Sequence, residues 1–128
     1  MDDAHASPLV LIVDDDPDGR ELYAVALQSA GFRVEEAGDG FEAVDKGYKL
    51  KPEIILMDLL MPRLDGWEVV SWLKKNAFTR DIPIVAVTGA EAEVRQVALE
   101  AGCRAVLTKP CSTARLVEEV RRVLAGGR

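Results

Sequence analysis

Five short runs rich in Val, Ile and Leu divide the chain, and segments with helical periodicity lie between them. The runs are PLVLIV (8–13), FRVEEA (32–37), EIILM (53–57), IPIVAV (82–87) and RAVLT (104–108). Four are almost continuously apolar, as expected of parallel strands buried on both faces. The second alternates apolar with charged residues and is typical of an edge strand. The alternation predicts an α/β fold, with a five-stranded parallel sheet and helices on both faces.

The helical segments carry apolar stripes that should face the sheet. The stripes are Leu22, Val25, Ala26 and Ser29; Val69, Val70 and Leu73; Val94, Val97, Ala98 and Ala101; and Leu116, Val120, Val123 and Leu124. Asp16 followed by Pro17 predicts the start of the first helix. Gly31 and Gly102 each follow an alanine and predict left-handed residues that end two helices.

Length and composition indicate one domain and exclude several classes of partner. The 128 residues fit a single core. We expect one folded unit over 8–125, with loose tails at 1–7 and 126–128. The net charge is −6 and the basic residues are scattered, which argues against direct nucleic-acid binding. No apolar run approaches the roughly 18 residues of a membrane span, and the acidic N-terminus is no signal peptide, so we expect a cytoplasmic protein.

The two cysteines do not change this interpretation. Cys103 and Cys111 lack the spacing of a metal site or a disulfide framework. Small buried apolar side chains are the simplest role for them.

Polar side chains follow four of the five predicted strands. Asp14 and Asp15 end the first, Asp58 ends the third, Thr88 ends the fourth, and the fifth leads into Lys109. In a parallel sheet these ends share one edge, where ligands bind. Each residue alone has an ordinary explanation as a cap, a turn residue or a solvated lysine.

Together these side chains indicate a site. Three carboxylates in a small volume repel one another unless a cation neutralises them. Carboxylate oxygens suit Mg²⁺, or Mn²⁺ in its place. An acid cluster, a metal, a hydroxyl and an ammonium are the groups that phosphoryl transfer needs, and Asp58 is the natural nucleophile. Asp16 needs no such role, because helix capping explains it.

The chain resembles the receiver domain of two-component response regulators, in its stand-alone, CheY-like form. The resemblance runs from Leu9 to Leu124 and rests on LIVDDD, AGDGFEAV, IILMDLLMPRLDGWE, PIVAVTG and TKP, in the family's order and spacing. It implies the flavodoxin-like strand order 2-1-3-4-5. It also implies a sensor histidine kinase or a histidine phosphotransfer protein as phosphodonor, and an unknown downstream protein as the target of binding or phosphorelay. No output domain is expected after the last helix.

The resemblance assigns roles to individual residues. Asp58 would be the phosphoacceptor, Asp15 a direct Mg²⁺ ligand and Asp14 a ligand mainly through water. The backbone carbonyl of Leu60 would be the remaining metal ligand. The phosphoryl oxygens would be bound by Thr88 and Lys109.

The resemblance also predicts the form of two loops. The Lys109–Pro110 bond would be cis, although most X–Pro bonds are trans. Pro62 and Gly66 would shape the loop after the acceptor, and Asp65 would cap the next helix.

Three positions depart from the family's pattern: Val106, Cys111, where the family usually has Phe, and Gly89, where Ala or Ser is common. Val106 occupies the position where the family often has a Tyr or Phe that turns inward as a switch. The resemblance also implies that the side chains two residues past the acceptor and two past the threonine flank the water that hydrolyses the phospho-aspartate. Here these residues would be Leu60 and Ala90, and neither offers a donor or acceptor. A long-lived phosphorylated form is therefore expected.

Two alternative function classes fit the sequence less well. An aspartate-nucleophile phosphatase of the haloacid dehalogenase type would need a second acid at position 60, where this chain has Leu60. A receiver fold kept only as a scaffold would not need all five site side chains.

The two tryptophans carry separate expectations. Trp72 flanks the apolar stripe of its helix and should be partly buried. Trp67 points away from that stripe and would be either an exposed partner anchor or packed on the loop.

Overall fold

The computed structural model describes residues 7–60, 66–89 and 92–126, with only the backbone described at 92 and 93. Strands and helices alternate along the chain as the sequence predicts. The strands are β1 (Leu9–Val13), β2 (Arg33–Ala37), β3 (Ile54–Met57), β4 (Ile84–Thr88) and β5 (Ala105–Thr108). The helices are α2 (Pro17–Ser29), α3 (Gly40–Leu50), α4 (Gly66–Lys75), α5 (Ala92–Glu100) and α6 (Thr113–Gly126).

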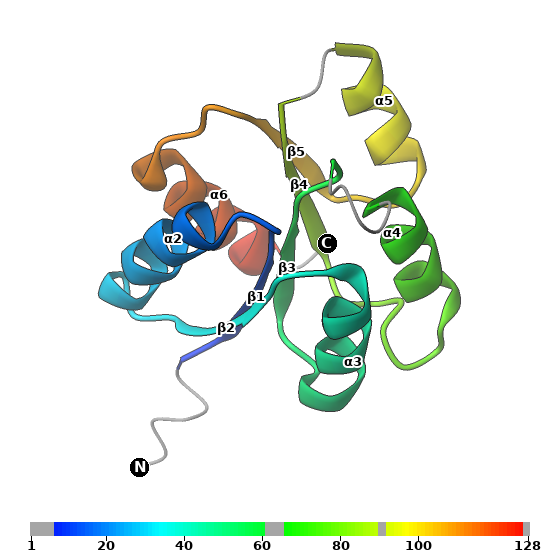
Figure 1. Cartoon of the computed structure of the whole chain (residues 1–128), viewed down its shortest axis with the longest axis horizontal. Helices are drawn as coiled ribbons and strands as arrows, with labels where there is room; N and C mark the ends of the chain where they lie inside the picture. Colours follow the sequence, from blue (N-terminus) through cyan, green and yellow to red (C-terminus); the bar gives the residue numbers. More distant parts are fainter. Residues whose placement is uncertain (1–6, 61–65, 90–91, 127–128) are drawn as a thin grey trace.

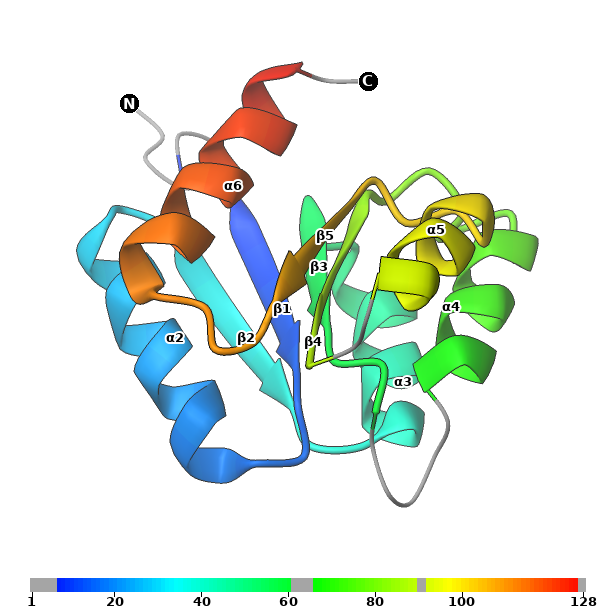
Figure 2. The ribbon, with the colours of Figure 1, turned by 90° about the horizontal axis from the view of Figure 1, so that it is seen from above.

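The five strands form one parallel sheet in the order β2-β1-β3-β4-β5. This confirms the predicted flavodoxin-like fold. Helices α2 and α6 cover one face of the sheet, and α3, α4 and α5 cover the other (Figures 1 and 2). Strand β2 lies at the edge and is only partly buried, whereas β1, β3 and β4 are buried throughout. The alternating and the continuous apolar runs are thereby explained by position in the sheet.

Each face of the sheet has its own apolar core, because successive residues of a strand point to opposite faces. Under α2 and α6 the core includes Ile12, Leu56 and Leu116. Under α3, α4 and α5 it includes Leu11, Ile55 and Leu73. All six side chains are at most 2 % exposed. No helix within the described ranges is long and apolar enough to cross a membrane.

The predicted helix ends are confirmed. The side chain of Asp16 accepts a hydrogen bond from the backbone N–H of Asp18, at 3.3 Å, and so caps α2. Gly31 and Gly102 have φ values of 101° and 114°, in the left-handed region that glycine adopts without steric cost.

The predicted buried face of α2 was wrong. Leu22 and Val25 are 59 % and 54 % exposed, and the buried residues are Tyr23, Ala24 and Leu27. Two sides of this helix carry apolar residues, and the side with Tyr23 faces the sheet and α6.

Of the other three predicted apolar stripes, two are confirmed and the one on α5 is confirmed only in part. On α5, Ala98 is buried and Val94 packs against the core, while Val97 and Ala101 are exposed. Those on α4 and α6 are confirmed: Val69, Val70, Leu73, Leu116, Val120 and Val123 are buried, and Leu124 packs against the core.

Trp72 is partly buried, as expected, whereas Trp67 is not the exposed residue that its place on the helix suggested. Trp67 is half-buried and packs against the core on the α3–α5 face of the sheet. Trp72 is 41 % exposed. The N-terminus of α4 approaches the segment after β3 closely, because a Cβ atom on Gly66 would lie only 2.7 Å from the carbonyl oxygen of Asp58. This close approach brings the second residue of the helix, Trp67, to the core as well.

Candidate functional site

The polar side chains at the strand ends are held in place by backbone hydrogen bonds that continue the sheet. The N–H of Asp14 donates to the carbonyl of Ala37 at 3.1 Å, and that of Asp58 donates to the carbonyl of Val13 at 3.0 Å. The N–H of Lys109 donates to the carbonyl of Thr88 at 2.9 Å. Each site residue therefore leaves the sheet at a fixed position rather than from a loose loop.

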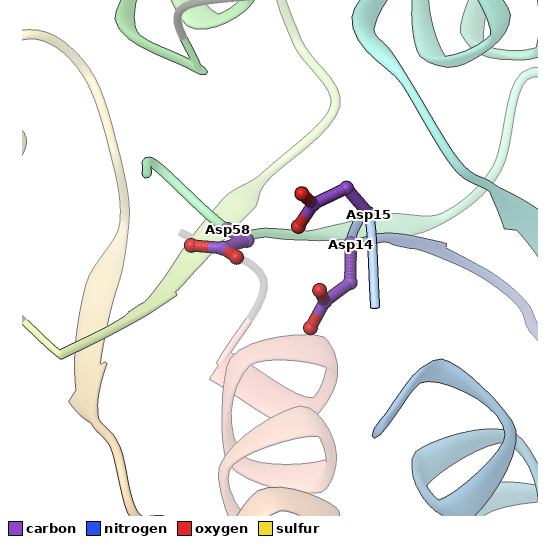
Figure 3. A group of neighbouring side chains, drawn as sticks. All are labelled: Asp14, Asp15 and Asp58. Carbon is purple, nitrogen blue, oxygen red and sulfur yellow. The ribbon is translucent and has the colours of Figure 1, made fainter. Parts of the chain in front are cut away.

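Three carboxylates meet at this edge of the sheet. Asp14, Asp15 and Asp58 each offer an oxygen, and these atoms lie within 4.8 Å of one another (Figure 3). The side chains of Asp14 and Asp58 are buried, and that of Asp15 is exposed. Two carboxylates of the cluster are thus shielded from solvent, and the third faces solvent.

Lys109 bridges the two buried carboxylates. Its Nζ lies 3.1 Å from Oδ2 of Asp14 and 3.4 Å from Oδ2 of Asp58. Burial alone would lower the pKa of this ammonium, but the hydrogen bond to Asp14 and the two negative charges outweigh burial and raise the pKa above its ordinary value. The lysine therefore stays charged and links β5 to β1 and β3.

Asp58 has an environment of opposing influences. Burial raises the pKa of its carboxyl, and the nearby Asp14 charge adds to this. The N–H of Leu60, which donates to Oδ1 at 3.0 Å, and the Lys109 charge act against it, and the net shift is upward. The folded protein therefore favours the protonated form of Asp58. The stability that this form contributes is fully present below the unfolded-state pKa and is lost as the pH rises through the folded-state pKa. An ionised Asp58 therefore carries a cost in the folded protein at neutral pH.

Thr88 ends β4 with a buried hydroxyl. Its Oγ1 has no hydrogen-bond partner among the described residues, and such a group costs about 1–3 kcal/mol when left unpaired. Functional sites often keep a group of this kind for a ligand. The orphaned donor fits the expected role of Thr88 toward a phosphoryl oxygen.

The donor set fits a small divalent cation. Three carboxylate oxygens in reach of one another are the hard ligands that Mg²⁺ takes, and one exposed member leaves room for water. The cluster is therefore consistent with a magnesium site formed by Asp14, Asp15 and Asp58.

Millimolar Mg²⁺ should raise the melting temperature of the wild-type protein by several degrees, because the cation binds the folded cluster and relieves its repulsion. Asp15→Asn should raise the melting temperature of the metal-free protein and weaken the response to Mg²⁺. Differential scanning fluorimetry with and without EDTA measures both effects. Asp81→Asn, an exposed aspartate in the turn before β4, serves as the control and should respond like the wild type. An unchanged wild-type melting curve would contradict the site.

Arg20 is a site residue that the sequence analysis missed. Its Nη1 donates to the backbone carbonyl of Asp14 at 2.7 Å, and its Nε donates to Oε1 of Glu36 at 3.0 Å. A Cβ atom on Gly38 would lie 3.1 Å from the guanidinium, so the absence of a side chain there makes room for it. The arginine ties the loop that carries the acidic pair to the end of β2. In the sequence, the local feature that could have indicated this role is the position of Arg20, one turn into the helix that follows the acidic pair.

The remaining expected residues fall in three groups. The Leu60 side chain is 58 % exposed, and its backbone N–H donates to Asp58. Val106 is buried in β5, and Arg95 donates to its carbonyl at 3.0 Å. Pro62, Asp65 and Ala90 lie outside the described residues. The Lys109–Pro110 peptide bond is cis, as expected.

Comparison with known proteins places this geometry in a family. A model of the response regulator receiver domain matches residues 10–121. The polar-differentiation response regulator DivK of Brucella anthropi is 34 % identical over 120 residues, covering 90 % of this chain and 94 % of the relative.

Two solved structures extend the similarity to the fold. The chemotaxis protein CheY4 of Vibrio cholerae is 32 % identical, with a TM-score of 0.86, over 91 % of this chain and 98 % of that one. The receiver domain of the sensor histidine kinase PA1611 of Pseudomonas aeruginosa is 29 % identical, with a TM-score of 0.84, over 93 % and 98 % of the two chains. That structure has a magnesium ion coordinated in its active site cleft.

Proposed function

The chain belongs to the response regulator receiver family, and on that premise we propose that Asp58 accepts a phosphoryl group from a sensor histidine kinase or a histidine phosphotransfer protein. A receiver is a phosphoacceptor signalling module and not an enzyme that turns over a separate substrate. We further propose that the phosphorylated form signals by binding another protein or by passing the phosphoryl group on. The receiver unit would span residues 8–125.

One observation carries the proposal: the buried Asp58 carboxylate lies within reach of both a metal-suited pair of acids and the Lys109 ammonium. In the transfer, an oxygen of Asp58 attacks phosphorus and the bond from phosphorus to the donor histidine nitrogen breaks. Mg²⁺, when bound, would neutralise charge on the phosphoryl oxygens.

The neighbouring residues would position the group and balance its charge. Lys109 is already within ion-pair distance of Asp58, so it can pair with a phosphoryl oxygen without a large movement. The buried Thr88 hydroxyl would donate to another phosphoryl oxygen. Asp14 and Asp15 would hold the metal, with the Leu60 carbonyl as a further ligand.

The response to phosphorylation would differ from a switch built on an aromatic ring. Position 106 is a buried valine, which has no ring to turn inward when Thr88 moves. We therefore propose that the change is concentrated in the segment that follows Thr88.

The test is phosphorylation by acetyl phosphate. With Mg²⁺ present, intact-protein mass spectrometry should show one added phosphoryl group on the wild type and none on Asp58→Asn. Asp45→Asn, which removes an exposed carboxylate on α3, is the control and should be phosphorylated like the wild type. EDTA should suppress the reaction. Phosphorylation that survives Asp58→Asn would place the acceptor elsewhere.

A further inference from the structure

Exposed aromatic side chains are concentrated on one part of the surface. The chain has seven aromatic residues, and the structure leaves four of them exposed, all on α3, α4 and the turn after α4. The four are Phe41 (79 % exposed), Tyr48 (45 %), Trp72 (41 %) and Phe78 (59 %). Helices α3 and α4 lie side by side on the same face of the sheet (Figure 1). Aromatic residues are enriched where proteins bind one another.

Two of these aromatic rings have partners within the protein. Tyr48 and Phe78 pack edge to face, with ring centroids 5.4 Å apart, and Nζ of Lys51 lies 4.9 Å from the centre of the Phe78 ring. Among the described residues, no ring contact of this kind involves Phe41 or Trp72. Ring contacts within the protein therefore account for the placement of Tyr48 and Phe78, but not for that of Phe41 and Trp72.

Phe41 and Trp72 line a mainly apolar hollow between the two helices. The hollow has a volume of about 350 Å³, and we call it the α3–α4 groove. It is lined by Gly40, Phe41, Val44, Asp45, Glu68, Val69 and Trp72. Gly40 adds no side chain to its lining. A space of this size can hold one large apolar side chain.

The charged residues that line the groove are both acidic. Asp45 lies on α3 and Glu68 on the first turn of α4. Asp45 pairs with Lys49 at 3.2 Å, but both side chains are more than half exposed, so this pair contributes little and can exchange partners. No ion pair within the described residues involves Glu68. The groove therefore complements a positively charged occupant.

From these observations we propose that the α3–α4 groove binds an amphipathic helix of a partner protein. The helix would place one large apolar side chain between Phe41 and Trp72, and Lys or Arg residues beside Asp45 and Glu68. A second copy of this chain is a poor occupant, because two identical acidic rims would repel. None of the residues that line the groove belongs to the acidic cluster, so the unphosphorylated protein can be used to test the proposal.

The probe is a synthetic helical peptide with Leu and Phe on one face and flanking Lys and Arg. Titration into the unphosphorylated, isotope-labelled protein should shift amide resonances of α3 and α4, together with the indole N–H resonance of Trp72. A peptide with the same apolar residues and Glu in place of each basic residue should bind at least about tenfold more weakly. Shifts centred on α2 and α6, or equal binding of the two peptides, would overturn the proposal.

Three variants separate groove binding from general attraction to an acidic protein. Phe41→Ser and Glu68→Lys should each weaken the basic peptide by about tenfold or more. Leu22→Ser, at a 59 % exposed position on α2, should leave the affinity unchanged. Phe41→Ser and Leu22→Ser lie on the surface of helices, so their melting temperatures should stay within about two degrees of the wild type. Glu68→Lys places a positive charge in the first turn of α4 and should lower the melting temperature by a few degrees without unfolding the protein. Unaltered affinity in Phe41→Ser would overturn the proposal, as would a wild-type dimer in sedimentation that Phe41→Ser dissociates.

Discussion

Gly66→Ala should lower the free energy of unfolding by about 3 kcal/mol, the upper end of the usual cost of overpacking. The new Cβ atom would lie 2.7 Å from the carbonyl oxygen of Asp58, 2.7 Å from Cα of Leu59 and 2.9 Å from the carbonyl oxygen of Leu59. All three are backbone atoms, so no side chain can rotate to relieve the contact. Either α4 or the segment after β3 must move.

Urea unfolding measures this cost, and Gly126→Ala provides the matched control. A Cβ atom at Gly126, in the last turn of α6, meets nothing within 4 Å, so its effect should stay within about 0.5 kcal/mol. Phosphorylation of Gly66→Ala by acetyl phosphate should also slow, because the displaced segment carries the acceptor. Equal stabilities of the two variants would mean that the helix is not held against Asp58 as described.

Leu60→Asn should shorten the lifetime of the phosphorylated protein by roughly tenfold. Hydrolysis of the phospho-aspartate needs a water positioned in line with phosphorus. Leu60 follows the acceptor by two residues, and its apolar side chain can neither orient that water nor admit it readily. Asparagine offers a donor and an acceptor at the same place. Ala90→Glu should act in the same direction, because it adds a polar group at the other flanking position.

The decay of the phosphorylated form, followed by mass spectrometry after the phosphodonor is removed, gives the lifetime. Leu22→Asn is the matched control, because Leu22 is 59 % exposed and Leu60 is 58 % exposed, while only Leu60 adjoins the acceptor. The control should decay like the wild type. If Leu60→Asn and Ala90→Glu both decay like the wild type as well, these two positions do not set the lifetime.

The sheet and its polar edge could be predicted because both depend on local patterns. A buried parallel strand needs a continuous apolar run, and the residue that ends it lies at a known edge. These two rules are enough to predict that Asp14, Asp15 and Asp58 lie close together. Lys109 follows from the same argument, although its two ion-pair partners do not.

The errors arise where a distant contact decides between local alternatives. On α2 the arc with Leu22 and the arc with Tyr23 are both apolar. The hydroxyl of Tyr23 donates to the carbonyl of Cys111 at 3.4 Å, across 88 positions of sequence. Arg20 was missed for the same reason, because Arg20 lies on helix α2 while Glu36, its ion-pair partner, lies on strand β2. The burial of Trp67 depends on how closely the N-terminus of α4 approaches the acceptor segment.

The bridge from Lys109 to two carboxylates also sets which ions the edge of the sheet can accept. With all three aspartates ionised, the single ammonium leaves two negative charges uncompensated. A divalent cation cancels that excess, whereas Na⁺ or K⁺ leaves half of it and a trivalent ion reverses its sign. Without the lysine the excess would be three, and Mg²⁺ would no longer balance it. One side chain in the segment after β5 thus leaves the cluster with the charge that a divalent cation would balance.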